Sequence, residues 1–190
     1  MTAPCAAPIE PDVLLDYWTG ALPDVVATRL EEHLFECGTC AGDFARLVAL
    51  GAGIVTLVRQ GRTSGILSRT LLNRLQREGM NVRTYSVSPG ETLLCAAFPA
   101  DDLLVVALRA NLAGVDSVTV SITGIEGLPM QEIADVPVVA SDGEVLWATS
   151  GAVVRQMPTG QVHVTLSASG GDVLAKYTLD HSALGPAREH

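Results

Sequence analysis

The sequence has few basic side chains and no long hydrophobic segment. Its 190 residues include 12 Lys and Arg against 21 Asp and Glu, and the formal net charge is −9 at pH 7. Binding to nucleic-acid phosphates requires clustered Lys and Arg, so we expect no direct contact with nucleic acid. The longest apolar run, residues 47–58, includes two glycines and is shorter than the roughly 20 residues that a membrane-spanning helix needs. We therefore expect no membrane anchor.

Cysteine is scarce as well, and no secretory leader is recognisable. Residues 1–9 offer neither a basic start nor an apolar stretch of useful length, so we expect a cytoplasmic protein. The four cysteines, Cys5, Cys37, Cys40 and Cys95, do not form the dense framework of a secreted disulfide-rich domain. In a reducing compartment such a cluster more often binds a metal ion.

Apolar material for a folded core, by contrast, is plentiful. Hydrophobic residues make up 48% of the chain and charged residues 17%, which is unlike a disordered protein. Acidic residues are concentrated at the N-terminal end, where residues 1–46 contain eight Asp and Glu against only Arg29 and Arg46. An acidic surface of this kind suits a basic protein partner.

The first 79 residues have the periodicity of helices. Apolar residues three and four positions apart predict helices over 11–19, 23–37, 40–60 and 66–78, with a hinge at 62–65. Gly20 is placed to end the first helix, and Pro23 suits the first turn of the second. Gly51 and Gly53 weaken the prediction in the middle of the third helix.

After Met80 the hydrophobic period changes to two. Strands are expected at 82–87, 91–97, 103–110, 117–122, 136–140, 145–148, 161–167 and 173–180, separated by turns rich in Gly, Pro, Ser and Asp. Short strands punctuated in this way predict a β-sandwich or a small barrel. We therefore expect an α+β protein with a helical domain at 1–79, a β-sandwich-like sensory or regulatory domain at 80–184 and a tail at 185–190.

The motif with the clearest chemistry is H-x3-C-x2-C. His33 and Cys37 are four residues apart and so lie on one helix face, and a turn at Gly38 allows Cys40 to approach the same point. Cysteine and histidine donors suit tetrahedral Zn²⁺, whereas hard cations prefer oxygen ligands. The motif predicts a zinc site.

A fourth zinc ligand must come from elsewhere in the chain. Cys5 is the natural candidate, because it precedes the first predicted helix, and Glu10 and Asp12 are weaker ones. Cys95 stands in an apolar strand pattern and is expected to be an ordinary core residue. The remaining histidines are scattered over strands and tail and give no second metal cluster that the sequence reveals.

Other kinds of protein also use these residue types. A thiol oxidoreductase would use Cys37 and Cys40 as a redox pair, but such pairs usually follow a strand, whereas here a predicted helix precedes them. A buried histidine with two inert thiols is a third interpretation. A zinc enzyme would need an open coordination position and a general base, for which only Glu32 and Glu36 are nearby. Nothing else supports catalysis, so we do not expect an enzyme.

The segment 10–46, with L-L-D-Y-W-T-G-A-L-P-D followed by R-L-E-E-H-L-F-E-C-G-T-C, resembles the zinc-binding domain of bacterial anti-sigma factors. In that family a glycine closes the first helix, a Leu-containing turn opens the second and the second ends in H-x3-C-x2-C. Gly20 and Leu22 occupy the first two of these places. The family usually has its fourth ligand just before the first helix, which by counting falls on Ala7, whereas this chain has its cysteine at Cys5.

The resemblance implies a function. Such proteins fold around a sigma factor of the extracytoplasmic-function type and block its access to RNA polymerase, with a fourth helix, here 66–78, completing the clasp. In some members oxidation of the ligands expels zinc and frees the sigma factor, whereas in others the zinc is purely structural, and the sequence leaves both open. The expected apolar contacts with the partner are Leu15, Trp18, Leu22, Leu47, Leu50 and Leu71.

Overall fold

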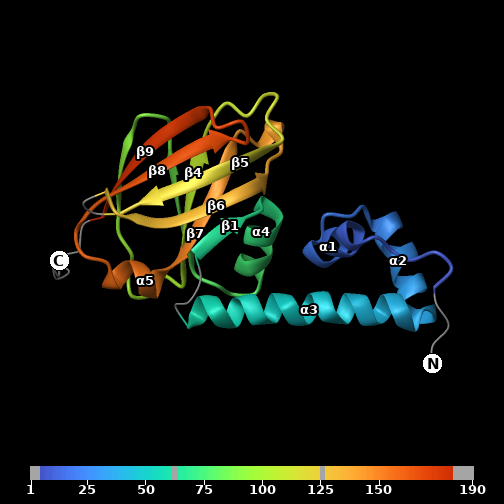
Figure 1. Cartoon of the computed structure of the whole chain (residues 1–190). Coiled ribbons are helices and arrows are strands. Elements are labelled where there is room, and N and C mark those ends of the chain that lie inside the picture. Colours follow the sequence, from blue (N-terminus) through green and yellow to red (C-terminus); the bar gives the residue numbers. More distant parts are fainter. Residues whose placement is uncertain (1–4, 61–63, 125–126, 182–190) are drawn as a thin grey trace.

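The computed structural model describes residues 5–60, 64–124 and 127–181. It is a mixed α+β structure with its helices mainly in the N-terminal part and its two sheets in the C-terminal part. A long helix runs from beneath the sheets to a pair of shorter helices at the other end of the molecule (Figure 1). The helical bounds are α1 Pro11–Thr19, α2 Asp24–Glu36, α3 Gly38–Arg59, α4 Arg69–Arg77 and α5 Gly151–Gln156.

The first three helices confirm the sequence prediction closely. α1 ends where Gly20 adopts a left-handed conformation with φ 73°, which glycine reaches without steric cost. α2 follows Pro23, whose fixed φ suits the start of a helix. Cys37 is at once the last residue before α3 and the C-terminal cap of α2, so the two helices join without an intervening loop.

Nine strands of the described part of the chain form two sheets. Their bounds are β1 Ser64–Leu67, β2 Val82–Val87, β3 Thr92–Cys95, β4 Leu103–Arg109, β5 Ser117–Thr123, β6 Pro129–Pro137, β7 Glu144–Ser150, β8 Gly160–Ala168 and β9 Val173–His181. One sheet has the order β1-β7-β4-β2 and the other β3-β9-β8-β5-β6. The two are joined by a shared apolar core that includes Val106 and Trp147 from the first sheet and Val120 and Val164 from the second.

The two sheets differ in how many of their faces are covered. Along β5 buried and half-buried residues alternate, as expected for a strand with one face on the core. β4 is buried at nearly every position, because a second apolar cluster lies on the outer face of its sheet. There Val58 of α3 and Leu72 and Leu75 of α4 pack with Val105 and its neighbours. The helical and sheet parts are therefore in direct contact.

Two predictions of elements were wrong, and one helix was missed. The fourth helix was expected from residue 66, but Ser64–Leu67 form β1, which pairs with β7; the rest of the expected hinge lies outside the described residues. A strand was expected at 136–140, but β6 runs over Pro129–Pro137 as an edge strand, where proline costs no ladder hydrogen bond. The short α5 was not expected.

The small helices dock on α3 and α4 through Trp18. Its indole ring lies against the backbone of α3 at Gly51, where a β-carbon would overlap with the ring. The guanidinium of Arg74 lies over the same ring, 5.2 Å from its centroid, and donates a hydrogen bond to the carbonyl of Trp18. Arg77 donates to the carbonyl of Thr19. Two cations of α4 thus meet the carbonyl end of α1, where the helix dipole favours positive charge.

Candidate metal centre

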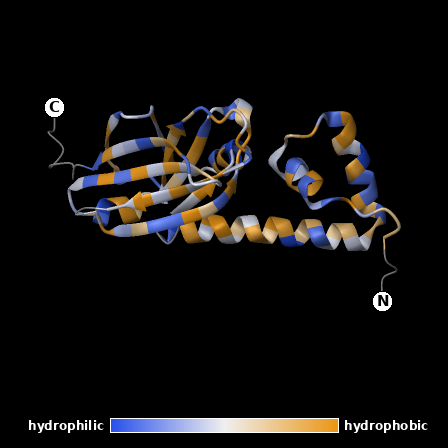
Figure 2. Cartoon of the chain, turned by 45° about the horizontal axis from the view of Figure 1, so that its top comes forward, coloured by the Kyte–Doolittle hydropathy of each residue, from blue (hydrophilic) through white to orange (hydrophobic). Residues whose placement is uncertain are grey.

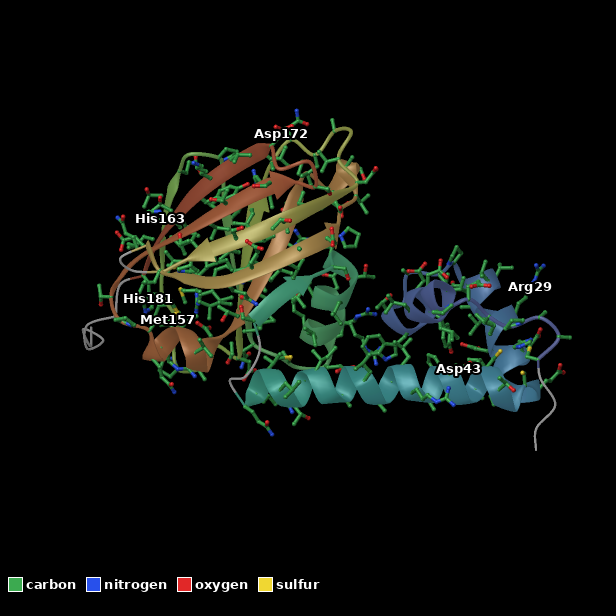
Figure 3. The ribbon with its side chains drawn as sticks, in the orientation of Figure 1. Arg29, Asp43, Met157, His163, Asp172 and His181 are labelled. Carbon is green, nitrogen blue, oxygen red and sulfur yellow. The ribbon has the colours of Figure 1, made fainter. Side chains whose placement is uncertain are left out.

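Four side chains converge where α2 meets α3. His33 lies in the last turn of α2, Cys37 at the junction and Cys40 in the first turn of α3. Cys5 approaches from the segment that precedes α1. The donor atoms of all four lie within 4.8 Å of one another, and Figure 3 shows sulfur atoms gathered at this junction. The structure thus brings together the three motif residues and the expected fourth ligand.

The separations among His33, Cys40 and Cys5 fit the edges of a coordination tetrahedron, and the sulfur of Cys37 lies within 4.8 Å of the other three donor atoms. Nε2 of His33 lies 3.3 Å from Sγ of Cys40 and 3.6 Å from Sγ of Cys5, and the two sulfurs are 3.8 Å apart. Metal–sulfur bonds of about 2.3 Å and metal–nitrogen bonds of about 2.0 Å give tetrahedral edges of about 3.5 to 3.8 Å. The four residues could therefore hold one tetrahedral metal ion.

The local electrostatics favour a thiolate at Cys37. The backbone amide of Cys40 is the largest cause that lowers the pKa of the Cys37 thiol to about 7, and the side chain of Cys5 acts in the same direction. At Cys5 the backbone amide of Ala7 lowers the pKa of the thiol, but burial and the thiols of Cys37 and Cys40 outweigh it and raise the pKa above its ordinary value. The cluster therefore contains one thiol that ionises readily and is suited to metal binding or oxidation.

The alternative fourth ligands have other roles in the described structure. Glu10 occupies the N-terminal cap position of α1 without a side-chain hydrogen bond to the helix, and Oδ1 of Asp12 accepts a hydrogen bond from the backbone N–H of Val13 at 2.9 Å. The metal-binding group found among the described residues contains Cys5 and neither carboxylate. The fourth cysteine, Cys95, lies in β3, where burial and the nearby charge of Asp180 raise its pKa.

The six expected partner contacts do not form a single exposed surface. Leu50 and Leu15 are 63% and 42% exposed, and Leu22 and Leu47 are half-buried. Trp18 is buried, with 8% of its surface exposed. Leu71 packs against the apolar cluster on the outer face of the sheet that contains β4. A partner could reach the first four side chains without a change in the structure, but not Trp18.

Several exposed apolar residues were missed by the sequence analysis. Phe35 of α2 is 91% exposed, and further large apolar side chains are exposed on the helices: Val25, Val26, Val48 and Leu57. Their positions in the sequence of the helices did not indicate that no other part of the molecule would pack against them. The helical part therefore carries more apolar surface than the sequence suggested.

The longest helix is also the most apolar. By length and composition α3 is the one helix among the described residues that could cross a membrane, with a mean hydropathy of 1.6. Only 11% of its most apolar window is buried, whereas a core helix that passes the same test is mostly buried. Figure 2 shows hydrophobic residues spread along α3. Because the uninterrupted apolar run in this helix covers only residues 47–58, a helix long and apolar enough to cross a membrane was not expected here.

No protein-family model matches the chain, and no curated protein sequence matches it.

Proposed function

We propose that this protein is an anti-sigma factor whose helical part, held by one zinc ion on Cys5, His33, Cys37 and Cys40, binds and inhibits a sigma factor of the extracytoplasmic-function type. The observation that carries the proposal is the presence of Cys5 at the H-x3-C-x2-C site, because it completes the ligand set that the resemblance implies. Three cysteines and one histidine form a closed set with no position for substrate, as in structural zinc sites.

The zinc would hold the helices α1, α2 and α3 together. It joins the segment before α1 to both ends of the α2–α3 junction, so three pieces of chain are fixed at one point. Among the described residues, α1 and α2 contribute nothing to the three hydrophobic clusters of the molecule. A small helical unit with so little core needs another source of order.

The surface of the helical part supports a protein partner. Exposed apolar side chains lie on α2 and α3, among them Phe35 near the end of α2 and Leu50 in the middle of α3. Exposed acidic side chains, such as Glu31, Glu32 and Glu36, lie on α2 as well. Apolar anchors supply binding energy and acidic groups steer a basic partner. A sigma factor, which contacts DNA and polymerase with basic surfaces, has that character.

A lipid bilayer is the competing partner for α3. Spanning a membrane would require α3 to release Trp18 from Gly51 and to separate Val58 from the cluster with Leu72 and Leu75. These contacts hold α1 and α4 against the C-terminal half of the helix, and the ring of Tyr17 in α1 packs on Phe44 in its N-terminal half. The proposal therefore assigns the exposed part of α3 to a protein.

The test is inhibition of sigma-dependent transcription. The full chain is co-expressed with each extracytoplasmic-function sigma factor of its own genome, and co-purification and transcription from the cognate promoter are measured. We expect one sigma factor to be bound and silenced. Leu50→Glu should relieve the silencing, whereas the matched change Val173→Glu, at an exposed valine of β9, should not. Silencing of no sigma factor by a folded, zinc-loaded chain would reject the proposal.

A further inference from the structure

The two sheets form a sandwich around their shared core, and this sandwich contains a small, partly open cavity at the end where α5 lies. The cavity has a volume of about 30 Å³, which is the room of roughly one water molecule. Most of its lining is apolar: Leu104, Val106, Trp147, Val154, Val162 and Leu179. A cavity of this size is too small for an organic metabolite but large enough for a single ion.

Three soft or borderline donor residues line this cavity, each from a different element. Cys95 ends β3, His181 ends β9 and Met157 follows α5 directly. Cys95 and His181 are direct partners in the parallel pairing of β3 with β9, so both side chains lie on the same face of the sheet. Figure 3 shows Met157 and His181 beside one another at this end of the sandwich.

His181 has an unused donor atom. Only 5% of this residue is exposed. Among the described residues, its Nδ1 is the one buried side-chain nitrogen or oxygen atom without a hydrogen-bond partner. A buried polar atom without a partner costs about 1 to 3 kcal/mol, so an interaction that satisfies it would be favourable. A lone pair on Nδ1 is available to a metal ion when the imidazole is neutral.

From these observations we infer that Cys95, Met157 and His181 form a binding site for one Cu⁺ ion. Thiolate, thioether and imidazole together are the donors that select Cu⁺, whereas zinc sites rarely include methionine. The Cys95 thiol loses its proton to solvent as the copper–sulfur bond forms. A thiolate with a monovalent ion carries no net charge, whereas a divalent ion would leave a positive charge buried among apolar side chains. Met157 is only half-buried and provides the route from solvent.

The test is an anaerobic titration of the full zinc-loaded chain with Cu⁺ in the presence of a competing chromophoric chelator. Zinc retention is measured in the same samples, because the cluster at Cys37 also offers soft ligands. We expect one Cu⁺ per chain to bind with zinc retained, and X-ray absorption to report both sulfur and nitrogen ligands. Cys95→Ala should abolish this binding and Met157→Leu should weaken it at least tenfold.

The matched control is Met130→Leu, which changes a half-exposed methionine of β6 that does not line the cavity. It should leave the affinity for Cu⁺ unchanged. Met157→Leu keeps the volume of the side chain and should preserve the fold, so it still tests the site if Cys95→Ala disturbs folding. Copper uptake that displaces zinc in equal amount, or uptake that survives both Cys95→Ala and Met157→Leu, would overturn the inference.

Discussion

The helical part and the sandwich are held together by different forces. The sandwich has a continuous core in which residues such as Val120, Val164 and Leu166 are fully buried. In the helical part a few buried side chains, such as Leu14 and Leu30, are separated by exposed apolar ones. The sandwich can be stable through hydrophobic burial alone. In our proposal the helical part depends on a metal ion at the Cys5, His33, Cys37 and Cys40 cluster and on the contacts of Trp18, and its exposed apolar side chains are covered by a protein partner.

Removal of the metal should produce the largest difference between the two parts. A structural zinc site contributes on the order of 10 kcal/mol to the folding of a small domain. We expect a strong chelator to increase hydrogen exchange throughout α1, α2 and the first half of α3, while β4, β5 and β8 stay protected. Cys37→Ser should have the same effect, and Cys95→Ser should leave the helices protected. Helices that keep their protection without metal would contradict the proposed role of the cluster.

Two of the glycines of α3, Gly51 and Gly53, offer a test with a smaller expected effect. A β-carbon at Gly51 would overlap with the Trp18 ring, whereas one at Gly53 meets no atom within 4 Å. Gly51→Ala should therefore destabilise the docking of α1 by about 1 to 3 kcal/mol. Gly53→Ala should instead stabilise the helix by up to about 1 kcal/mol. Thermal unfolding followed by tryptophan fluorescence measures both, and an equal shift of the two variants in the same direction would show that Trp18 does not lie against Gly51.

Acid should affect the sandwich through Asp101. This buried carboxylate accepts hydrogen bonds from Nε of Arg83 at 2.7 Å and from the amide of Phe98 at 2.7 Å. Burial alone would raise the pKa of Asp101, but Arg83 and the amide hold it below its ordinary value. A carboxyl with a lowered folded pKa stabilises the fold above its unfolded pKa of about 3.9, and this contribution is lost as the pH falls through the folded pKa.

Asp101→Asn should therefore cost about 1 to 2 kcal/mol at pH 7, a modest value because Arg83 is partly exposed and solvent screens the pair. The cost should be smaller in acid, as the pH falls through the folded pKa of Asp101. Urea unfolding at several pH values measures the difference. Asp172→Asn, at an exposed turn between β8 and β9, is the control and should cost less than about 0.5 kcal/mol at either pH. A cost of Asp101→Asn that does not change with pH would contradict the assigned ion pair.

Much of the fold could be predicted from local signals. Gly20, Pro23 and the helical spacing of apolar residues give the bounds of α1 and α2, and alternation reveals most strands. β6 was misplaced because prolines and charges interrupt its pattern, and its pairing with β5 includes a bulge near Asp135, which adopts φ 53°. β1 was missed because its four residues are ordered by pairing with β7, which is distant in sequence.

The candidate metal centre was more predictable than the cavity in the sandwich. Three of its ligands lie within eight positions, so helical spacing alone brings them together. Cys5 could be predicted as the fourth ligand because it lies shortly before the first helix, in a segment able to reach the other three ligands. Cys95, Met157 and His181 are far apart in the chain, and only the pairing of β3 with β9 and the position of α5 place them around one cavity. The exposure of Phe35 could not be predicted either, because it depends on which faces of α2 the rest of the molecule leaves uncovered.

The central claim is that Cys5, His33, Cys37 and Cys40 hold one zinc ion. The most direct measurement is the metal content of untagged protein by elemental analysis, for the wild type and for Cys5→Ser, Cys37→Ser and Cys95→Ser. We expect about one zinc per chain in the wild type and in Cys95→Ser, less in Cys5→Ser and almost none in Cys37→Ser. Wild-type protein that is folded, fully reduced and free of zinc would contradict the claim.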